Sequence, residues 1–120
     1  MQLTYKFDPK RNYILACSFG PDSMALFNLL YRAKCHFTVC FVNYHRRAEA
    51  DQEEKDISAY CKKLKIPLRV LDTKSLTVTG NFQEWAREAR YDFFQKVYRE
   101  INAAAVFVAH QQDDLIETYL

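Results

Sequence analysis

Residues 18–23 have the composition of a phosphate-binding turn. The segment reads Ser18-Phe19-Gly20-Pro21-Asp22-Ser23 and joins an apolar run to a stretch with helical spacing. A turn from a strand into a helix presents backbone N–H groups and the positive end of the helix dipole. Gly20 allows close approach of the backbone, and Pro21 presets the first helical turn. The segment matches neither GxxxxGK[ST] nor GxGxxG, so a plain polar turn capped by Asp or Ser is the alternative.

Acidic residues recur near the end of the sequence. His110, Asp113, Asp114 and Glu117 stand at positions i, i+3, i+4 and i+7, so they share one face if this segment is a helix. Carboxylates on one stripe repel one another, and we expect a cation there: Mg²⁺, a basic side chain or a cationic substrate. The alternative is a solvated helix start whose acids complement the dipole.

Two further segments combine cations with aromatic rings. Asn43-Tyr44-His45-Arg46-Arg47 follows an apolar run and could hold an anion or stack on a base. Arg87 and Arg90 lie among aromatic residues in a helical pattern. The alternatives are a solvated basic loop for the first segment and ordinary Glu–Arg helix pairs for the second.

The apolar pattern alternates short runs with longer helical periods. It predicts strands at 13–17, 37–42, 68–71 and 104–109, helices at 23–33, 51–65 and 81–101 with Asn81 as a cap, and a last helix from about Gln112. This order predicts an α/β fold, a doubly wound parallel sheet with helices on both faces. Ligands of such sheets bind beyond the carboxyl ends of strands, so we expect the chemistry just after residues 17, 42, 71 and 109.

The composition fits one globular domain over residues 1–120. Hydrophobic residues make up 49% and charged residues 27%, which excludes a disordered tail, a collagen-like chain and a disulfide-stapled miniprotein. The apolar positions Leu115, Ile116, Tyr119 and Leu120 form one face of the last expected helix, with no cap behind them. We therefore expect residues 1–120 to be the front part of a longer polypeptide.

The distribution of charge and of cysteines further restricts the class of protein. The net charge is +2. Residues 1–50 contain seven basic and three acidic residues, whereas residues 51–120 contain ten basic and twelve acidic ones. The first half is therefore better suited to bind phosphate. The longest apolar run has seven residues, whereas a membrane span needs about 20. The four cysteines contain no CxxC pair, which predicts reduced, buried thiols in a cytoplasmic protein.

Together these segments resemble the PP-loop ATP pyrophosphatases, whose loop reads SGGxDS. The resemblance lies in Ser18–Ser23, in Val42-Asn43 through Arg47, in the segment from Asn81 to Tyr91, and in the segment from His110 to Thr118. It is greatest to the members of this family that make lysidine in tRNA. The segments occur in the family's order and cover most of residues 13–120.

The resemblance implies a specific reaction. Such enzymes use ATP with Mg²⁺ to adenylate C2 of the wobble cytidine in an isoleucine tRNA with a CAU anticodon, releasing pyrophosphate. The amine of free L-lysine then attacks C2 and expels AMP. The acceptor is therefore a tRNA, no membrane is involved, and a homodimer is left open.

The resemblance also implies roles for the residues. Ser18, Phe19, Gly20, Pro21, Asp22 and Ser23 would cradle the pyrophosphate, Val42 and Asn43 would lie beside adenine, and Arg47, Arg87 and Arg90 would contact phosphate or RNA. Asp113, Asp114 and Glu117 would attract the ammonium groups of lysine or bind Mg²⁺, with Asp114 as a candidate metal ligand. Asp22 would either hold the loop or bind Mg²⁺. His110 or one of these carboxylates would be the base.

The sequence departs from the family at two places. Phe19 stands where the family loop has glycine, but its N–H remains, so we expect phosphate binding to survive. Tyr44-His45-Arg46 replaces a segment that usually begins with His, followed by Gly or Gln and then Leu. Two other classes stay open: a PP-loop tRNA thiolation enzyme, and a non-catalytic module that binds adenine nucleotides.

Overall fold

The computed structural model describes residues 8–17, 20–46, 48–109 and 116–119, which form a five-stranded sheet flanked by helices. The strands are β1 (Asn12–Ala16), β2 (His36–Asn43), β3 (Leu68–Asp72), β4 (Ala103–Ala109) and β5 (Ile116–Tyr119). The helices are α1 (Pro21–Arg32), α2 (Ala50–Leu64), the short 3₁₀ helix η1 (Thr73–Ser75) and α3 (Phe82–Ile101). The predicted α/β fold is confirmed.

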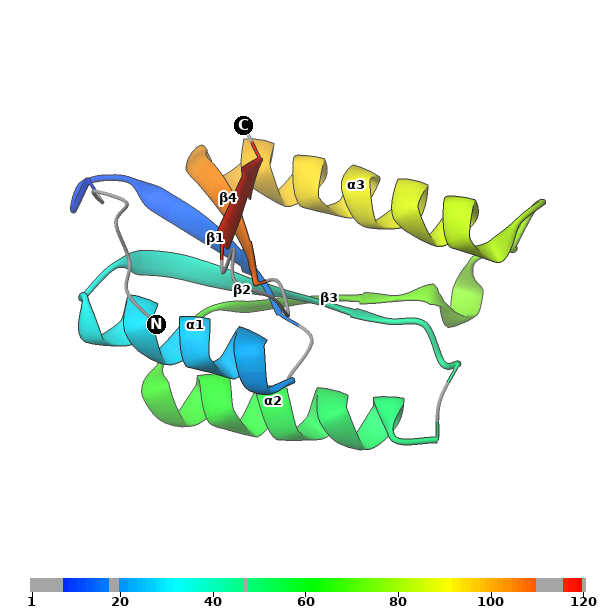
Figure 1. Ribbon diagram of the computed structural model, residues 1–120, viewed down its shortest axis with the longest axis horizontal. Coiled ribbons are helices and arrows are strands. Elements are labelled where there is room, and N and C mark those ends of the chain that lie inside the picture. Colours follow the sequence, from blue (N-terminus) through cyan, green and yellow to red (C-terminus); the bar gives the residue numbers. More distant parts are fainter. Residues whose placement is uncertain (1–7, 18–19, 47, 110–115, 120) are drawn as a thin grey trace.

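The sheet has the order β3-β2-β1-β4-β5, and β1 to β4 run parallel. β1 lies in the middle, paired with β2 on one side and with β4 on the other. Helices α1 and α2 cover one face of the sheet and α3 covers the other (Figure 1). This is the doubly wound arrangement that the alternation of strands and helices predicts.

Alternate residues of the central strand serve the two faces. Tyr13 and Leu15 belong to the core under α1 and α2, whereas Ile14 belongs to the core under α3. Ile14 and Leu15 have no exposed surface. A strand buried on both faces is a continuous apolar run, which is why residues 13–16 lack the alternation of a half-exposed strand.

The helix boundaries follow local signals in the sequence. The Asn81 side chain accepts hydrogen bonds from the N–H groups of Gln83 at 2.8 Å and Glu84 at 3.4 Å, so its predicted role as the cap of α3 is confirmed. Lys65 (φ +60°) directly follows α2 and Asn102 (φ +52°) directly follows α3, and both adopt the left-handed conformation that closes many helices.

The prediction of a last helix from about Gln112 is wrong for Ile116–Tyr119, which form strand β5, antiparallel to β4. Residues 110–115 lie outside the described part of the chain. The sequence Ile-Glu-Thr-Tyr alternates apolar with polar residues and is rich in β-branched and aromatic types, and β4 would otherwise leave an unpaired edge. Glu117 pairs with Val108 in this ladder, so the helical stripe expected to include Glu117 does not form there.

The cysteines are unbridged, as the sequence predicts, and Cys17, Cys40 and Cys61 are buried. Burial raises the pKa of the Cys40 thiol to about 12 and those of Cys35 and Cys61 to about 11. These three thiols are therefore weak nucleophiles at neutral pH. None of the helices in the described ranges is long and apolar enough to cross a membrane.

Truncation of Phe107 tests the packing of the sheet against α1. This residue of β4 is fully buried and stacks on Tyr13 with ring centroids 5.6 Å apart. We expect Phe107→Ala to lower the free energy of unfolding by about 3–5 kcal/mol, measured by urea denaturation. Val78→Ala, at a side chain that is 47% exposed, is the control and should cost less than about 0.5 kcal/mol. Equal losses in the two variants would contradict the packing described.

Candidate functional site

The strand order reverses at β1. From β1 the chain proceeds to β2 and β3 on one side of the sheet and then returns to place β4 on the other side. The N–H of Cys17 donates to the carbonyl of Cys40 at 3.0 Å, so the pairing continues to the carboxyl end of β1. Helix α1 begins four residues later, at Pro21. In open α/β sheets, the point where strand order reverses is where ligands bind.

The start of α1 gathers four of the residues that the sequence singles out. Gly20 is the N-cap, with φ −81° and ψ 170°, and no side chain caps the helix. Pro21 is its first residue, Asp22 is half-buried, and Ser23 is buried at 6% exposed. The first N–H groups of a helix have no partner within it, so this end suits an anion. Ser18 and Phe19 lie outside the described residues.

Asn43 ends β2 and is the hub of a hydrogen-bond network. Its side chain is almost fully buried at 1% exposed and donates to Asp51 at 2.9 Å and to Glu54 at 3.1 Å, both on α2. Its carbonyl accepts from the Thr73 hydroxyl at 2.9 Å. The Asn43 side chain therefore joins β2 to α2, and its backbone carbonyl joins β2 to η1.

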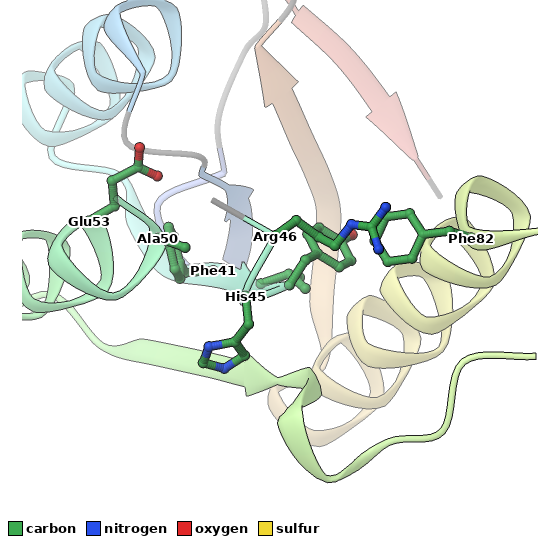
Figure 2. A pocket seen from close by; sticks show the side chains of 8 residues that line it. Phe41, His45, Arg46, Ala50, Glu53 and Phe82 are labelled. Atoms are coloured by element: carbon green, nitrogen blue, oxygen red, sulfur yellow. The ribbon is translucent and has the colours of Figure 1, made fainter. Parts of the chain in front are cut away.

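The loop after Asn43 lines a cavity of about 280 Å³ at the carboxyl end of β2 (Figure 2). Its lining comes from β2, the following loop, α2 and the first residue of α3: Phe41, Val42, Tyr44, His45, Arg46, Ala50, Glu53 and Phe82. The predicted ligand residue Val42 thus lines the cavity. Because most of these side chains are apolar or aromatic, the cavity suits a planar, largely apolar group better than a phosphate.

Tyr44 and Arg46 make an aromatic and cationic wall. The Arg46 guanidinium lies 3.9 Å from the centroid of the Phe82 ring, and Tyr44 meets the same ring edge-on at 6.0 Å. The Tyr44 hydroxyl donates to the Ala86 carbonyl at 3.5 Å. Burial raises the pKa of Tyr44, and the Arg90 guanidinium beside it opposes that rise. The phenol is therefore neutral at physiological pH.

The two predicted arginines of α3 lie on its exposed surface. Arg90 is beside Tyr44, so it stands close to the cavity wall. The Arg87 guanidinium lies 5.7 Å from the centroid of the Tyr91 ring. Both side chains remain accessible to solvent, and their contact with phosphate or RNA stays a prediction.

His45 lines the cavity, and the sequence alone gives it no definite role. Its φ is +55°, and its ring lies between Asp51, 3.2 Å from Nδ1, and Asp72, 2.6 Å from Nε2. The pKa of Asp72 is lowered, first by the hydrogen bond from the Lys74 N–H and then by His45. Because Asp51 and Asp72 belong to different elements, no local spacing in the sequence indicates this contact.

Most of the remaining predicted residues are not among those that the structure describes. Arg47, His110, Asp113 and Asp114 are outside the described residues, and Glu117 is in β5. Within the described ranges no three His, Cys, Asp or Glu side chains are grouped to hold a metal ion. The structure therefore leaves the Mg²⁺ prediction for Asp22 and Asp114 untested.

These features define a nucleotide-binding α/β class, and comparison with known proteins places the chain within it. The PP-loop domain family matches residues 1–120. The chain belongs to this family.

Two curated proteins with similar sequences are tRNA(Ile)-lysidine synthases. The chain is 43% identical over 116 residues to a tRNA(Ile)-lysidine synthase of Malacoplasma penetrans (strain HF-2), covering 91% of this chain and 38% of the relative. It is 40% identical over 108 residues to a tRNA(Ile)-lysidine synthase of Mycoplasmopsis pulmonis (strain UAB CTIP), and the match covers 89% of this chain and 37% of the relative. The chain thus spans less than two-fifths of the length of these relatives.

A solved structure supports the fold. The U34-tRNA thiolase NcsA from Methanococcus maripaludis, solved with its [4Fe-4S] cluster, matches with a TM-score of 0.72 and 16% identity. The match covers 87% of this chain and 39% of the thiolase. At this identity the likeness concerns the fold alone.

Replacing Asn43 by Asp tests the network at the end of β2. The amide donates to two carboxylates, and an aspartate there would place a third acceptor among them. We expect Asn43→Asp to lower the free energy of unfolding at pH 7 by about 2–4 kcal/mol. The crowded carboxyl would have a raised pKa in the folded state, so the loss should shrink as pH falls toward about 4.

The matched control is Asn28→Asp. Asn28 accepts a hydrogen bond from the Tyr60 hydroxyl at 2.9 Å, and an aspartate can still accept it. Urea denaturation at pH 7 and pH 4.5 measures both variants. A loss at Asn43 no greater than at Asn28, or one independent of pH, would contradict the network.

Proposed function

We propose that this chain is the ATP-binding and catalytic part of a cytoplasmic enzyme that forms lysidine in isoleucine tRNA. The observation that carries the proposal is the start of α1, which lies at the carboxyl end of β1, the strand where the order of the sheet reverses. The resemblance to the PP-loop family implies that the polyphosphate of ATP would be held there. The lysidine synthases among its relatives support the choice of tRNA and lysine as the other substrates.

ATP would lie across two neighbouring strand ends. The β- and γ-phosphates would meet the backbone at Gly20–Ser23, where the helix dipole stabilises the charge that grows on the departing pyrophosphate. Adenine would enter the cavity beside Val42, whose apolar and aromatic lining suits a planar base. Asp22, in the first turn of α1, would hold a Mg²⁺ ion, which would supply positive charge to offset that of the phosphates.

The reaction then needs two displacements. The C2 oxygen of the cytidine attacks the α-phosphorus of ATP, and pyrophosphate leaves with its bonding electrons. The amine of lysine next attacks C2, loses a proton to a base, and expels AMP. His110 or a carboxylate among Asp113, Asp114 and Glu117 would accept the proton and attract the ammonium groups of lysine. Arg87 and Arg90 would contact phosphate or RNA from the exposed surface of α3.

A tRNA thiolation enzyme is a less suitable assignment. Sulfur transfer through protein thiols needs accessible, reactive cysteines, commonly in CxxC pairs, and this sequence has no such pair. Burial raises the pKa of Cys35, Cys40 and Cys61 to about 11 or above. The cysteine environments therefore favour a reaction that does not use a protein sulfur.

The test follows AMP and lysine together. The complete protein that carries this chain is incubated with α-labelled ATP, labelled lysine and isoleucine tRNA with a CAU anticodon. We expect AMP release that requires both tRNA and lysine, with lysine incorporated into the tRNA. Asp22→Asn should reduce the rate by at least about tenfold, because it removes a charge beside the Mg²⁺ and the phosphates. Asp56→Asn, on the exposed surface of α2, is the matched control and should retain the rate.

Other outcomes would change the assignment. AMP release without lysine transfer would retain the ATP chemistry and reject the substrate. Binding of ATP without AMP release would indicate a non-catalytic nucleotide-binding module. Formation of ADP would contradict the assignment to pyrophosphate release.

A further inference from the structure

The loop that lines the cavity turns through a strained residue. His45 has φ +55°, in the left-handed region that side chains with a Cβ avoid. Its N–H donates to Oδ1 of Asn43 at 2.9 Å, which gives the turn one anchor. A non-glycine residue keeps such a conformation only when its surroundings hold it there. The contacts of the imidazole supply that restraint.

The imidazole of His45 joins two elements through its two nitrogens. Nδ1 lies 3.2 Å from Asp51 at the start of α2, and Nε2 lies 2.6 Å from Asp72 at the end of β3. Figure 2 shows the ring directed toward β3, whereas Arg46 extends in another direction to the ring of Phe82. His45 therefore fastens the middle of the loop, while its neighbour reaches the cavity wall.

The two aspartates that contact the His45 ring are themselves held by other hydrogen bonds. The Asp51 oxygen that meets Nδ1 also accepts from the Asn43 amide, and the Asp72 oxygen that meets Nε2 also accepts from the Lys74 N–H. Both carboxylates are thus acceptors. The ring of His45 is therefore held between two carboxylates that belong to different elements.

The residues on either side of His45 are the ones that contact the cavity wall. Tyr44 packs on Phe82 and donates to Ala86, and the guanidinium of Arg46 lies over the Phe82 ring. All of the loop side chains from 44 to 46 line the cavity. Loss of the contact between His45 and one aspartate would loosen Tyr44 and Arg46, because the backbone joins both residues directly to His45.

We propose that His45, whose ring lies between Asp51 and Asp72, is a positioning residue that fixes Tyr44 and Arg46 at the cavity where ATP binds. This inference rests on the proposed function. Loss of the ring should then weaken nucleotide binding. The charged groups that face this cluster are Asp51 and Glu54 on α2, Asp72 and Lys74 at the end of β3, and Arg46 on the same loop.

The test compares the affinities for ATP and for magnesium pyrophosphate by isothermal titration calorimetry. The complete protein carries either the native residue, His45→Asn or His36→Asn. Asparagine tolerates the left-handed backbone, but its shorter side chain cannot span both carboxylates. His36 is an exposed histidine at the opposite end of β2, so its variant is a matched control.

We expect His45→Asn to weaken ATP binding roughly two- to fivefold, the effect of one exposed charge-assisted hydrogen bond. Its affinity for magnesium pyrophosphate should match that of the native protein, because pyrophosphate has no base to place in the cavity. His36→Asn should bind both ligands as the native protein does.

A second variant protects the test against misfolding. Asp72→Asn can still accept from the Lys74 N–H but removes one charge facing the ring. It should also weaken the binding of ATP but not of magnesium pyrophosphate, and thermal unfolding verifies that it folds. Equal ATP affinity of the native protein, His45→Asn and Asp72→Asn would overturn the role of His45 alone. A native protein that does not bind ATP would overturn the proposed function and this inference together.

Discussion

The pairing of β1 with neighbours on both sides is the constraint on which the rest of the structure depends. Ile14 and Leu15 have no exposed surface, and they pack against helices on opposite faces of the sheet. Because the next strand runs parallel to β1, a tight hairpin cannot connect the two. The chain must therefore continue from the carboxyl end of β1 and cross over through a helix. That requirement places the start of α1 where the strand order reverses. The candidate site is therefore a consequence of burying the central strand, and its backbone N–H groups need no special side chain to attract an anion.

The neighbouring strand adds a different environment to the same edge. At the end of β2, the buried amide of Asn43 donates to two carboxylates of α2, and His45 in the loop that follows contacts Asp51 and Asp72. The cavity behind that loop is mostly apolar and aromatic, with Arg46 over Phe82 at its wall. One edge of the sheet thus presents a polar helix end beside an apolar cavity. A nucleotide has the same division, with a charged polyphosphate at one end and a planar base at the other.

Most of the fold follows from patterns that act over short distances. The apolar run at 13–16, the helical periods and the cap at Asn81 each depend on neighbours within a few residues, so the sequence predicts them. The sequence pattern predicts a helix at Ile116–Tyr119, where the structure has a strand. This strand is stabilised by pairing with β4, a partner that periodicity does not reveal. The same limit applies to the site. Gly20, Pro21, Asp22 and Ser23 are adjacent in the sequence, so their grouping was predictable, whereas the contact of His45 with Asp72 joins residues 27 positions apart.

The central claim is that the start of α1 binds the polyphosphate of ATP while the cavity at the end of β2 binds its base. Backbone amide NMR spectra of the chain, titrated with magnesium pyrophosphate and then with magnesium ATP, test this claim directly. We predict that the amide signals of Gly20, Asp22 and Ser23 shift with both ligands, and that those of Asn43 and Tyr44 shift only with ATP. Unchanged signals at the start of α1, with the largest shifts elsewhere in the sheet or helices, would contradict the account.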